Sequence, residues 1–346
     1  MILFISKYPS KQNEKDGMVQ RIAAIDKIFG AHDRVYLDIS HRRYLIPRKV
    51  NLSDEVTVYQ VHMLFGVFLA LYMSIFAQRV YVHSVLNAVK VLPLYFVSNK
   101  IITDMHGIVP EELEMEGRRG ASRIFGVVER IAVKRSARII TVTQAMQKFL
   151  AAKYGGTAAA ITVPIFDPVA NAPKSEITKE KMTVIYAGGV QQWQNVDLML
   201  RAMQSTSDRY TFVLLSGEQQ ILRAKCAALG ISDVTIASVG KDEVYSWYAN
   251  AELGFVLRDD VAVNNVACPT KLIEYLINGV VPVVIHPNIG DFNQMGYAFV
   301  TLDEFLNQTV TPGEIAAKRE QNFRVVDAYQ QDIAAGISQL AGLAQP

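Results

Sequence analysis

Residues 269–283 read Pro-Thr-Lys-Leu-Ile-Glu-Tyr-Leu-Ile-Asn-Gly-Val-Val-Pro-Val. Pro269 to Asn278 has the pattern of a helix, and Val281 to Ile285 is a short run rich in β-branched residues. A helix followed closely by such a strand is typical of a parallel sheet that helices cover on both faces. This stretch therefore predicts an α/β fold for the part of the chain around it.

The same alternation of short β-rich runs and helical patterns extends along the whole sequence. In the first half the expected strands are Ile2 to Ser6, Arg34 to Leu37, Val56 to Val61, Val80 to His83, Lys100 to Asp104 and Ala137 to Val142, with helices that begin near Met18, Met63, Leu86, Ser122 and Thr143. In the second half the other expected strands are Thr183 to Ala187, Thr211 to Leu215, Val234 to Ala237 and Leu253 to Val256, with helices at Asn195 to Met203, Glu218 to Ala228 and Lys241 to Ala249. The alternation predicts doubly wound, Rossmann-like α/β domains.

The length of 346 residues fits two domains better than one. A segment rich in proline, alanine and charged residues is typical of an interdomain linker. We therefore expect an N-terminal domain at 1–166, a linker at 167–181 and a C-terminal domain at 182–325. The helical pattern from Pro312 to Leu343 is too long for the second domain alone, so we expect residues 326–346 to form a helix that packs back on the first.

Composition excludes several classes of protein. The chain has 35 basic and 33 acidic residues, a formal net charge of +2, and 50% hydrophobic residues. That balance argues against a disordered chain and against a nucleic-acid-binding protein, which usually shows a strong basic excess. Two cysteines, Cys226 and Cys268, cannot build a disulfide framework or a structural zinc site by themselves, so we expect a reducing compartment.

The most apolar segments predict buried elements rather than export or membrane signals. The N-terminal Met-Ile-Leu-Phe-Ile-Ser turns polar at Lys7 and lacks the basic start and long apolar run of a signal peptide, so we expect a cytoplasmic protein. Leu64 to Ala77 holds no charge, but its roughly 14 residues fall short of the about 20 that a spanning helix needs. We expect a buried helix there, in preference to one inserted in a membrane.

Several familiar catalytic motifs are missing from the sequence. There is no G-x-G-x-x-G after the first strand, no G-x-x-x-x-G-K-[ST], no G-x-S-x-G and no H-E-x-x-H. Open α/β sheets bind ligands at the carboxyl ends of their strands, so a cleft between two such domains is the expected active site. Three stretches fall in loops there: Asp104 to Gly107, Tyr186 to Gly189, and Leu257 to Tyr275.

The order of these stretches resembles that of the GT-B glycosyltransferases, and within them the retaining family-4 enzymes that use nucleotide-sugar donors. The matching motifs are Gly17 in the loop after the first strand, Asp-Met-His-Gly at 104–107, Glu129 on a helix before Ala-Arg-Ile-Ile-Thr-Val-Thr at 137–143, Val163-Pro164, Tyr-Ala-Gly-Gly at 186–189, and the stretch 269–283. The resemblance implies two Rossmann-like domains that face a cleft, the first binding the acceptor and the second the donor.

The same resemblance implies a reaction. A sugar would pass from a nucleotide-diphosphate sugar to a glycan or lipid-linked acceptor in bacterial cell-surface polysaccharide synthesis, with retention and without a cofactor. Two rival functions stay open: a non-catalytic GT-B subunit that binds a nucleotide sugar or a partner enzyme, and a sugar-nucleotide epimerase or hydrolase on the same fold.

Donor-binding residues also follow from the resemblance. Glu274 matches the second glutamate of the family's E-x-x-x-x-x-x-x-E motif and would accept hydrogen bonds from ribose hydroxyls; the alternative is a first-turn carboxylate that complements the helix dipole. Val266 stands where the family has the first glutamate. Gly188 and Gly189 would let the backbone approach the phosphates closely, or they simply form a turn. The full expected donor-binding set is Gly17, Gly188, Gly189, Gly217, Gly240, Pro269, Thr270 and Glu274.

The family often neutralises the diphosphate with an Arg and a Lys just after the opening strand of its second domain. Gly189 and Gln194 occupy these positions here. Arg258 and Lys271 flank the Glu274 helix, so we expect them to replace the missing cations as catalytic residues. The alternative is a solvated surface pair.

His106 follows an apolar strand, so it is expected at the carboxyl edge of the sheet, facing the cleft. By resemblance it contacts the donor sugar, and Asp104 orients its ring or the loop, which makes both candidate catalytic residues. A satisfied structural histidine is the alternative. Neither is assigned as a general base, because in retaining transferases of this type the leaving phosphate is thought to assist the acceptor hydroxyl.

Two further stretches carry charge. Between Arg118 and Arg138 the basic residues are interleaved with apolar ones, so Arg118, Arg119 and Arg123 are candidates for contact with an anionic membrane at its inner face and with a lipid-linked acceptor; a solvated helix face is an equal alternative. Asp259-Asp260 is a weaker candidate for a divalent cation than for an ordinary turn, so no metal site is predicted.

Overall fold

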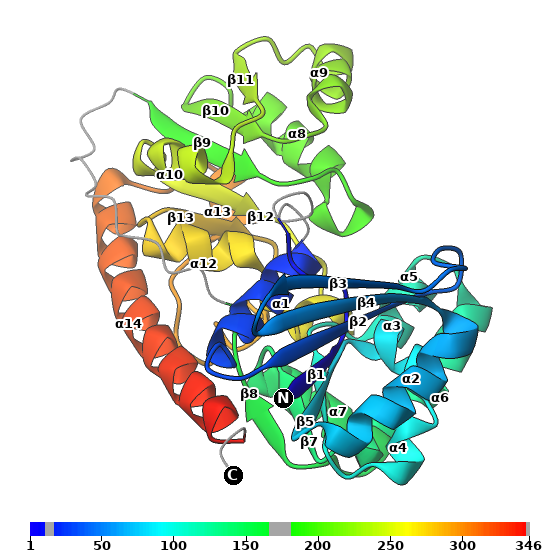
Figure 1. The fold of residues 1–346 in the computed structure, drawn as a ribbon. Coiled ribbons are helices and arrows are strands. Elements are labelled where there is room, and N and C mark those ends of the chain that lie inside the picture. The colour runs from blue at the N-terminus through cyan, green and yellow to red at the C-terminus, as the bar shows by residue number, and fades with distance from the viewer. Residues whose placement is uncertain (11–16, 166–180, 344–346) are drawn as a thin grey trace. The chain divides into compact units, whose positions relative to one another are not determined.

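The computed structural model describes residues 1–10, 17–165 and 181–343. The chain divides into two compact units, Met1–Phe166 with Asp332–Pro346, and Asp167–Gln331 (Figure 1). Apart from Lys181, the expected linker at 167–181 lies outside the described residues, as does most of the loop before Gly17. Each unit is built on its own parallel sheet, which confirms the predicted α/β class.

Unit 1 has an eight-stranded sheet in the order β3-β4-β2-β1-β5-β6-β7-β8. Its strands are β1 (Ile2–Ile5), β2 (Arg34–Ser40), β3 (Arg48–Ser53), β4 (Val56–His62), β5 (Arg79–His83), β6 (Ile101–Met105), β7 (Arg138–Thr141) and β8 (Ala160–Thr162). All neighbours are parallel except β3, which pairs with β4 antiparallel. Inner parallel strands carry apolar runs because both of their faces are covered, whereas every residue of β3 is exposed. The apolar pattern therefore predicts β1 and misses β3.

The helices of unit 1 pack around an aromatic core. They are α1 (Gly17–Ile28), α2 (Met63–Phe76), α3 (Val85–Ala88), η1 (Val89–Val91), α4 (Leu94–Val97), α5 (Val109–Met115), α6 (Arg119–Arg135) and α7 (Gln144–Tyr154). In the core Phe4 of β1 stacks on Tyr36 at 4.7 Å between ring centres, and its ring lies 5.1 Å from that of Tyr81. These contacts join β1 to β2 and β5, its two neighbours in the sheet.

A partly buried cluster of three charged residues joins α5, α6 and α7. The Lys153 Nζ lies 2.7 Å from Oε1 of both Glu111 and Glu129. The Tyr154 hydroxyl also donates to Glu129 Oε1 at 2.7 Å. Glu129 is completely buried. This glutamate is one of the residues that carry the sequence resemblance, and in the structure it holds these helices together.

The helix α2 differs most from the sequence prediction. Its small residues Gly66, Ala70 and Ser74 are buried, while most of its large apolar side chains are exposed; Phe68 is 70% exposed. A Cβ at Gly66 would lie 2.9 Å from Ile39 Cγ2 of β2, so close packing on the sheet requires a small residue there. The prediction of a buried helix at Leu64 to Ala77 was therefore wrong, because apolar content alone does not say which face points inward.

Unit 2 has a six-stranded parallel sheet in the order β11-β10-β9-β12-β13-β14. The strands are β9 (Met182–Ala187), β10 (Tyr210–Leu215), β11 (Val234–Ala237), β12 (Leu253–Val256), β13 (Val281–Val284) and β14 (Val300–Thr301). The helices are η2 (Gln192–Gln194), α8 (Val196–Ser205), α9 (Gln219–Ala228), α10 (Lys241–Ala249), α11 (Ala262–Asn265), α12 (Thr270–Ile277) and α13 (Leu302–Leu306). The stretch 269–283 thus folds into α12 and β13, as its sequence predicts.

The last helix, α14 (Pro312–Gly342), contributes to the cores of both units. Ile315 belongs to the core of unit 2, and the Asn322 side chain bonds the backbone N–H and carbonyl of Ala298 at 2.7 and 2.9 Å. Leu340 belongs to the core of unit 1. A terminal helix that crosses back to the first sheet is therefore confirmed.

Candidate functional site

Each unit begins its sheet in the middle, and this topology creates a switch point in each sheet. In unit 2 the chain starts at β9, adds β10 and β11 on one side, and then adds β12, β13 and β14 on the other. The loops after β9 and β12 leave neighbouring strand ends in opposite directions, which is the switch point where open α/β sheets bind ligands. Gly188 and Gly189 follow β9, and Arg258 lies just after β12, so three predicted residues lie there.

The Lys271 ammonium lies beside the Gly188 turn. Its Nζ donates to Gln194 Oε1 at 2.9 Å and lies 3.8 Å from the centre of the Tyr186 ring. A Cβ at Gly188 would lie 2.8 Å from Nζ, so glycine makes room for the ammonium. Gln194 is the position at which the resembling family often has a cation, and the structure brings the Lys271 charge to that side chain.

Lys271 is buried and Arg258 is half-buried. Burial, and then the charge of Arg258, lowers the pKa of Lys271 well below its usual range, while Glu274 opposes this. Burial also lowers the pKa of Arg258, whose Nη1 donates to Oδ1 of the buried Asn264 at 3.3 Å. Within the part of the chain that the structure describes, neither cation forms an ion pair with a carboxylate. A bound anion would supply the countercharge that both lack.

The N-terminus of α12 adds to this positive potential. Pro269 is its N-cap residue, Thr270 is exposed at the first helical position, and Lys271 comes second. The first turn holds no acidic residue. Because helix N-termini carry a partial positive charge and free N–H groups, they favour phosphates. The arrangement is therefore suited to a phosphate or diphosphate group.

Glu274 is positioned by a tyrosine. It is the fifth residue of α12, so the first-turn carboxylate considered above does not describe it. The Tyr248 hydroxyl donates to Glu274 Oε2 at 2.8 Å. Burial, and then the charge of Glu274, raises the pKa of Tyr248 well above its usual range, so the phenol remains a donor. Glu274 lies three residues after Lys271, hence on the same side of the helix.

The other glycines predicted in unit 2 lie further along the sheet edge. Gly217 follows β10, which neighbours β9, and Gly240 precedes α10 after β11, one strand further out. A Cβ at either position would meet no atom within 4 Å. Close backbone packing therefore does not require glycine at these two positions. The remaining predicted glycine, Gly17, is the first residue of α1 in unit 1.

The carboxylates of Asp259 and Asp260 accept hydrogen bonds from asparagine side chains. Asn195 Nδ2 donates to Asp259 Oδ1 at 3.0 Å, and Asn265 Nδ2 donates to Asp260 Oδ1 at 2.7 Å. Among the described residues no group of three or more His, Cys, Asp or Glu side chains is placed to hold a metal ion. These bonds fit the interpretation of an ordinary polar turn.

In unit 1 the switch point lies between β1 and β5, and Asp104 is buried on the neighbouring β6. Arg21 of α1 binds both of its carboxylate oxygens, through Nε at 3.0 Å and Nη2 at 3.1 Å. Burial alone would raise the pKa of Asp104, but Arg21 holds it well below its usual range. Arg21 Nη1 also donates to the carbonyls of Val163 and Pro164 at 2.8 and 3.1 Å. Asp104 is thus a fixed anion that ties α1 to the sheet.

Asp104 is connected to His83 through Tyr81. The Tyr81 hydroxyl donates to Asp104 Oδ2, so its oxygen can only accept in its 3.2 Å bond with His83 Nδ1. The His83 proton is therefore assigned to Nδ1, which leaves Nε2 as an acceptor in the neutral ring. The His83 and His106 rings stack with centres 4.5 Å apart, and Nε2 of each is buried without a hydrogen-bond partner.

His106 follows β6, as predicted, but it packs on His83 instead of standing free at an edge. Burial, with a smaller effect of His83, lowers the pKa of His106 to about 3. The ring is therefore neutral at physiological pH and is suited to hydrogen bonding with a hydroxyl rather than to acid catalysis. A Cβ at Gly107, the residue after it, would clash with Glu112 Oε1, so a larger residue there would require that carboxylate to move.

Sequence reasoning misses several residues of these clusters. His83 ends a predicted strand at the unit 1 switch point, so a rule based on strand ends would have found it. Arg21 lies within a helical pattern and Tyr81 within a strand, and neither carries a local signal. Tyr248 bonds Glu274 across 26 positions of the chain, and Asn264 bonds Arg258 across the loop of six positions after β12; neither contact has a local sequence signal.

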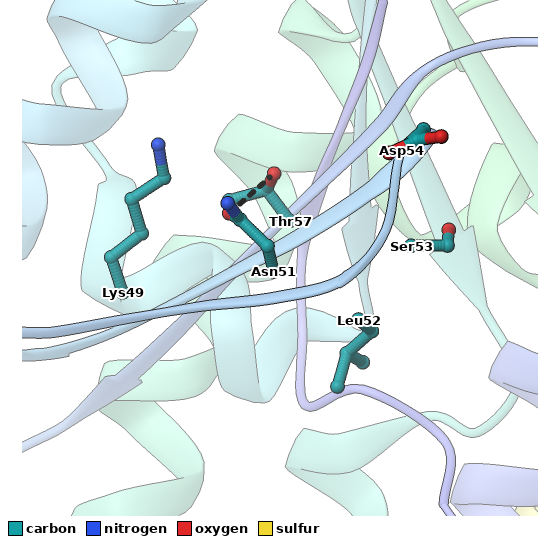
Figure 2. Close-up of a pocket in the computed structure, with 6 residues that line it drawn as sticks. All are labelled: Lys49, Asn51, Leu52, Ser53, Asp54 and Thr57. Carbon is teal, nitrogen blue, oxygen red and sulfur yellow. Dashed lines mark hydrogen bonds between the residues drawn. The ribbon is translucent and has the colours of Figure 1, made fainter.

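Arg118, Arg119 and Arg123 are exposed at the start of α6. Arg118 Nη1 lies 3.3 Å from Glu116 Oε2. A separate shallow pocket lies on the hairpin of β3 and β4, where Asn51 and Thr57 turn toward each other (Figure 2). None of the predicted site residues lines that pocket.

No protein-family model matches the sequence, and no curated protein matches it. Solved structures do match over almost the whole chain. HepE from Anabaena in complex with UDP-glucose is 16% identical, with a TM-score of 0.69 over 99% of this chain and 98% of that chain. Sucrose-phosphate synthase from Thermosynechococcus elongatus is 12% identical, with a TM-score of 0.66 over 98% and 96%.

A trehalose-6-phosphate protein from E. coli bound with UDP-2-fluoro glucose is 10% identical, with a TM-score of 0.66 over 100% and 99%. The chain has the GT-B fold. This confirms the fold implied by the motif order of the sequence. In GT-B terms, unit 2 is the C-terminal Rossmann-like domain and contains the Lys271 site.

Proposed function

We propose that this chain is a glycosyltransferase that moves a sugar from a nucleotide-diphosphate sugar to a glycan or lipid-linked acceptor. The observation that carries the proposal is the pair of buried cations, Lys271 and Arg258, beside the Gly188 turn and the N-terminus of α12. Neither has a carboxylate partner among the described residues, so the site has a strong preference for an anion such as a diphosphate.

These groups would act most strongly when the glycosidic bond breaks. Negative charge then grows on the departing diphosphate, and fixed cations and helix N–H groups that meet it there lower the barrier. Gly188 and Gly189 would let the phosphates approach the backbone. Pro269 and Thr270 start the helix that faces them. We assign Glu274 to the ribose hydroxyls, with its carboxylate oriented by Tyr248.

In unit 1 we assign His106 to the sugar hydroxyls, because its neutral ring carries a buried Nε2 without a partner. Asp104 positions His106 indirectly, through Tyr81 and His83. We further propose retention of configuration, no metal requirement, and a role in bacterial cell-surface polysaccharide synthesis. We also propose a reducing, cytoplasmic location, which fits a chain whose two cysteines, Cys226 and Cys268, are buried thiols.

The comparisons support a uridine diphosphate sugar as the first donor to test. HepE has been solved with UDP-glucose, and the E. coli protein with UDP-2-fluoro glucose. Because both share only the fold with this chain, the donor sugar, the base and the acceptor are open to experiment. Val266 replaces the glutamate with which the resembling family holds the sugar, so we include donors other than glucose.

The rival functions differ in what they consume. The protein is incubated with a panel of radiolabelled nucleotide sugars, with and without glycan and lipid-linked acceptors. We expect label in the acceptor only when acceptor is present, and loss of transfer in Lys271→Ala. Label released equally without acceptor would show a hydrolase, and binding without consumption would show a non-catalytic subunit. Either of these results would overturn the transferase proposal.

A further inference from the structure

The helix α2 exposes an apolar surface that the proposed reaction does not use. We define the α2 face as Leu64, Phe65, Phe68, Tyr72, Ile75 and Phe76, which are between 58% and 70% exposed. The opposite side of the helix packs on the sheet through Gly66, Ala70 and Ser74. Single exposed apolar residues are normal, but six on one helix face mark an interaction surface.

Neighbouring elements extend the α2 face. The N-cap residue of α2, His62, has its Nε2 3.2 Å from the carbonyl oxygen of His41, and the same loop carries Leu45 and Ile46, which are 78% and 79% exposed. Beyond the helix, α4 packs against both α2 and α6 (Figure 1). There Phe96 is also exposed.

The border of the α2 face is positively charged. Residues 41–49 include two pairs of adjacent basic residues, Arg42-Arg43 and Arg48-Lys49, and no acidic residue. On the α4 and α6 side the Arg135 guanidinium lies 4.6 Å from the centre of the Phe96 ring. The acidic residue of α6, Glu129, is buried and bound to Lys153, so it does not reduce this surface charge.

We propose that the α2 face docks on an anionic lipid bilayer, with α2 lying in the plane of the membrane. Acyl chains would accept the apolar side chains, and lipid headgroups would meet the basic border. A second copy of this chain fits less well, because a two-fold interface through the same patch would bring basic borders together. The 14 residues of α2 reach only about 21 Å, against about 30 Å of hydrocarbon.

The α2 face therefore supports a protein that lies on the membrane. Among the described residues no helix is long and apolar enough to cross a bilayer. Combined with the proposed function, on which this one step rests, the docking favours a lipid-linked acceptor over a soluble glycan. The docking itself does not depend on transferase activity.

The test is cosedimentation of the full chain with vesicles of phosphatidylcholine alone and of phosphatidylcholine mixed with phosphatidylglycerol. We expect binding to the mixed vesicles and a loss of about tenfold or more in the Phe65→Ser, Phe68→Ser double variant. Ile221→Ser removes an exposed apolar side chain from α9 in unit 2 and should bind as wild type. The Arg42→Glu, Arg43→Glu double variant should lose at least about fivefold per residue, because each change removes a positive charge and adds a negative one.

A second measurement reports contact with the acyl chains. The indole introduced by Phe68→Trp should be quenched by vesicles of brominated lipid, whereas that of Ile221→Trp should not be. The native indoles, Trp193 and Trp247, both belong to unit 2, and wild type gives their background.

Three results would overturn the docking proposal. They are no binding of wild type to anionic vesicles, equal binding by the Phe65→Ser, Phe68→Ser variant, and a wild-type dimer in solution that this variant dissociates. Calorimetric titration of the same proteins with UDP and UDP-glucose, without vesicles, tests the proposed function separately. Vesicle binding without nucleotide binding would overturn the transferase proposal and support the docking proposal. Nucleotide binding without vesicle binding would support the transferase proposal and overturn the docking proposal.

Discussion

Lys271, Arg258 and Glu274 belong to one site, but we expect them to act at different stages. A carboxylate on ribose hydroxyls contributes whether or not phosphates are present, whereas cations at the diphosphate matter most when charge develops in the transition state. Glu274→Ala should weaken the binding of both nucleoside diphosphate and intact donor by roughly 1 to 3 kcal/mol. Lys271→Ala and Arg258→Ala should lower kcat more than nucleoside affinity.

Calorimetric titration with nucleoside, nucleoside diphosphate and donor, together with initial rates, separates these effects. Lys225→Ala is the matched control, because Lys225 forms a surface ion pair with Asp197 at 2.6 Å in the same unit. If all three site variants bind nucleoside diphosphate and turn over like wild type, the donor does not bind at the unit 2 switch point.

His106 should make the folded protein sensitive to acid. Its pKa is lowered to about 3 in the folded state, against about 6.5 in an unfolded chain. Between these values the unfolded chain binds a proton that the folded one does not, so the free energy of unfolding falls as pH falls, by at most about 1.4 kcal/mol per pH unit. Above about pH 6.5 this residue contributes no pH dependence.

His106→Gln should therefore flatten the dependence of stability on pH between about 6.5 and 3, and it should also lower turnover if the ring binds the sugar. Denaturant unfolding at several pH values measures the first effect, and initial rates measure the second. His41→Gln, at an exposed position, is the matched control. An acid dependence identical to that of wild type would show that the His106 ring is not held in its neutral form by the fold.

At the scale of the element, α2 is unusual because its small residues are buried and most of its large apolar residues are exposed. Phe68→Ser should change the free energy of unfolding by no more than about 0.5 kcal/mol, since that side chain is exposed. Gly66→Leu should destabilise by about 1 to 3 kcal/mol, because a Cβ there already lies 2.9 Å from Ile39 Cγ2. Urea unfolding of the two variants gives the comparison. The opposite order would place the aromatic side of α2 in the core.

Elements buried on both faces are the part of this fold that the sequence predicts well. Strands such as β1 and β13 read as continuous apolar runs because helices cover the sheet on both sides. The exposed β3 lacks such a run, and it takes its structure from pairing with β4. For α2 the sequence predicts the helix but not which of its faces packs on the sheet. Every residue of α2 is uncharged, so the buried face is decided by which side chains are small enough to fit against β2.

The candidate site shows the same division between local and long-range information. Gly188 and Arg258 could be placed because each lies just after a strand, and strand order then brings them together. The Lys271–Gln194 contact joins residues 77 positions apart, and the Arg21–Asp104 pair joins residues 83 apart. Contacts of that range come from tertiary packing, which a single sequence does not encode in any local pattern.

At the scale of the whole molecule, α14 gives each unit part of its core, and its contact with unit 1 depends on a glycine. A Cβ at Gly336 would clash with the backbone carbonyl oxygen of Thr162 at the end of β8, whereas a Cβ at Gly342 would meet no atom within 4 Å. Both glycines lie in the same helix. In a helix interior, replacing glycine with alanine alone is worth up to about 1 kcal/mol of stabilisation.

The same substitution should therefore have different effects at the two positions. Gly342 is the last residue of α14, so Gly342→Ala should leave unit 1 about as stable as wild type. Gly336→Ala should destabilise it by about 1 to 3 kcal/mol, because the added methyl group must push α14 away from β8 and loosen Leu340 in the core. Hydrogen exchange of the β7 and β8 amides measures this locally, and unchanged protection in Gly336→Ala would show that α14 does not stabilise unit 1.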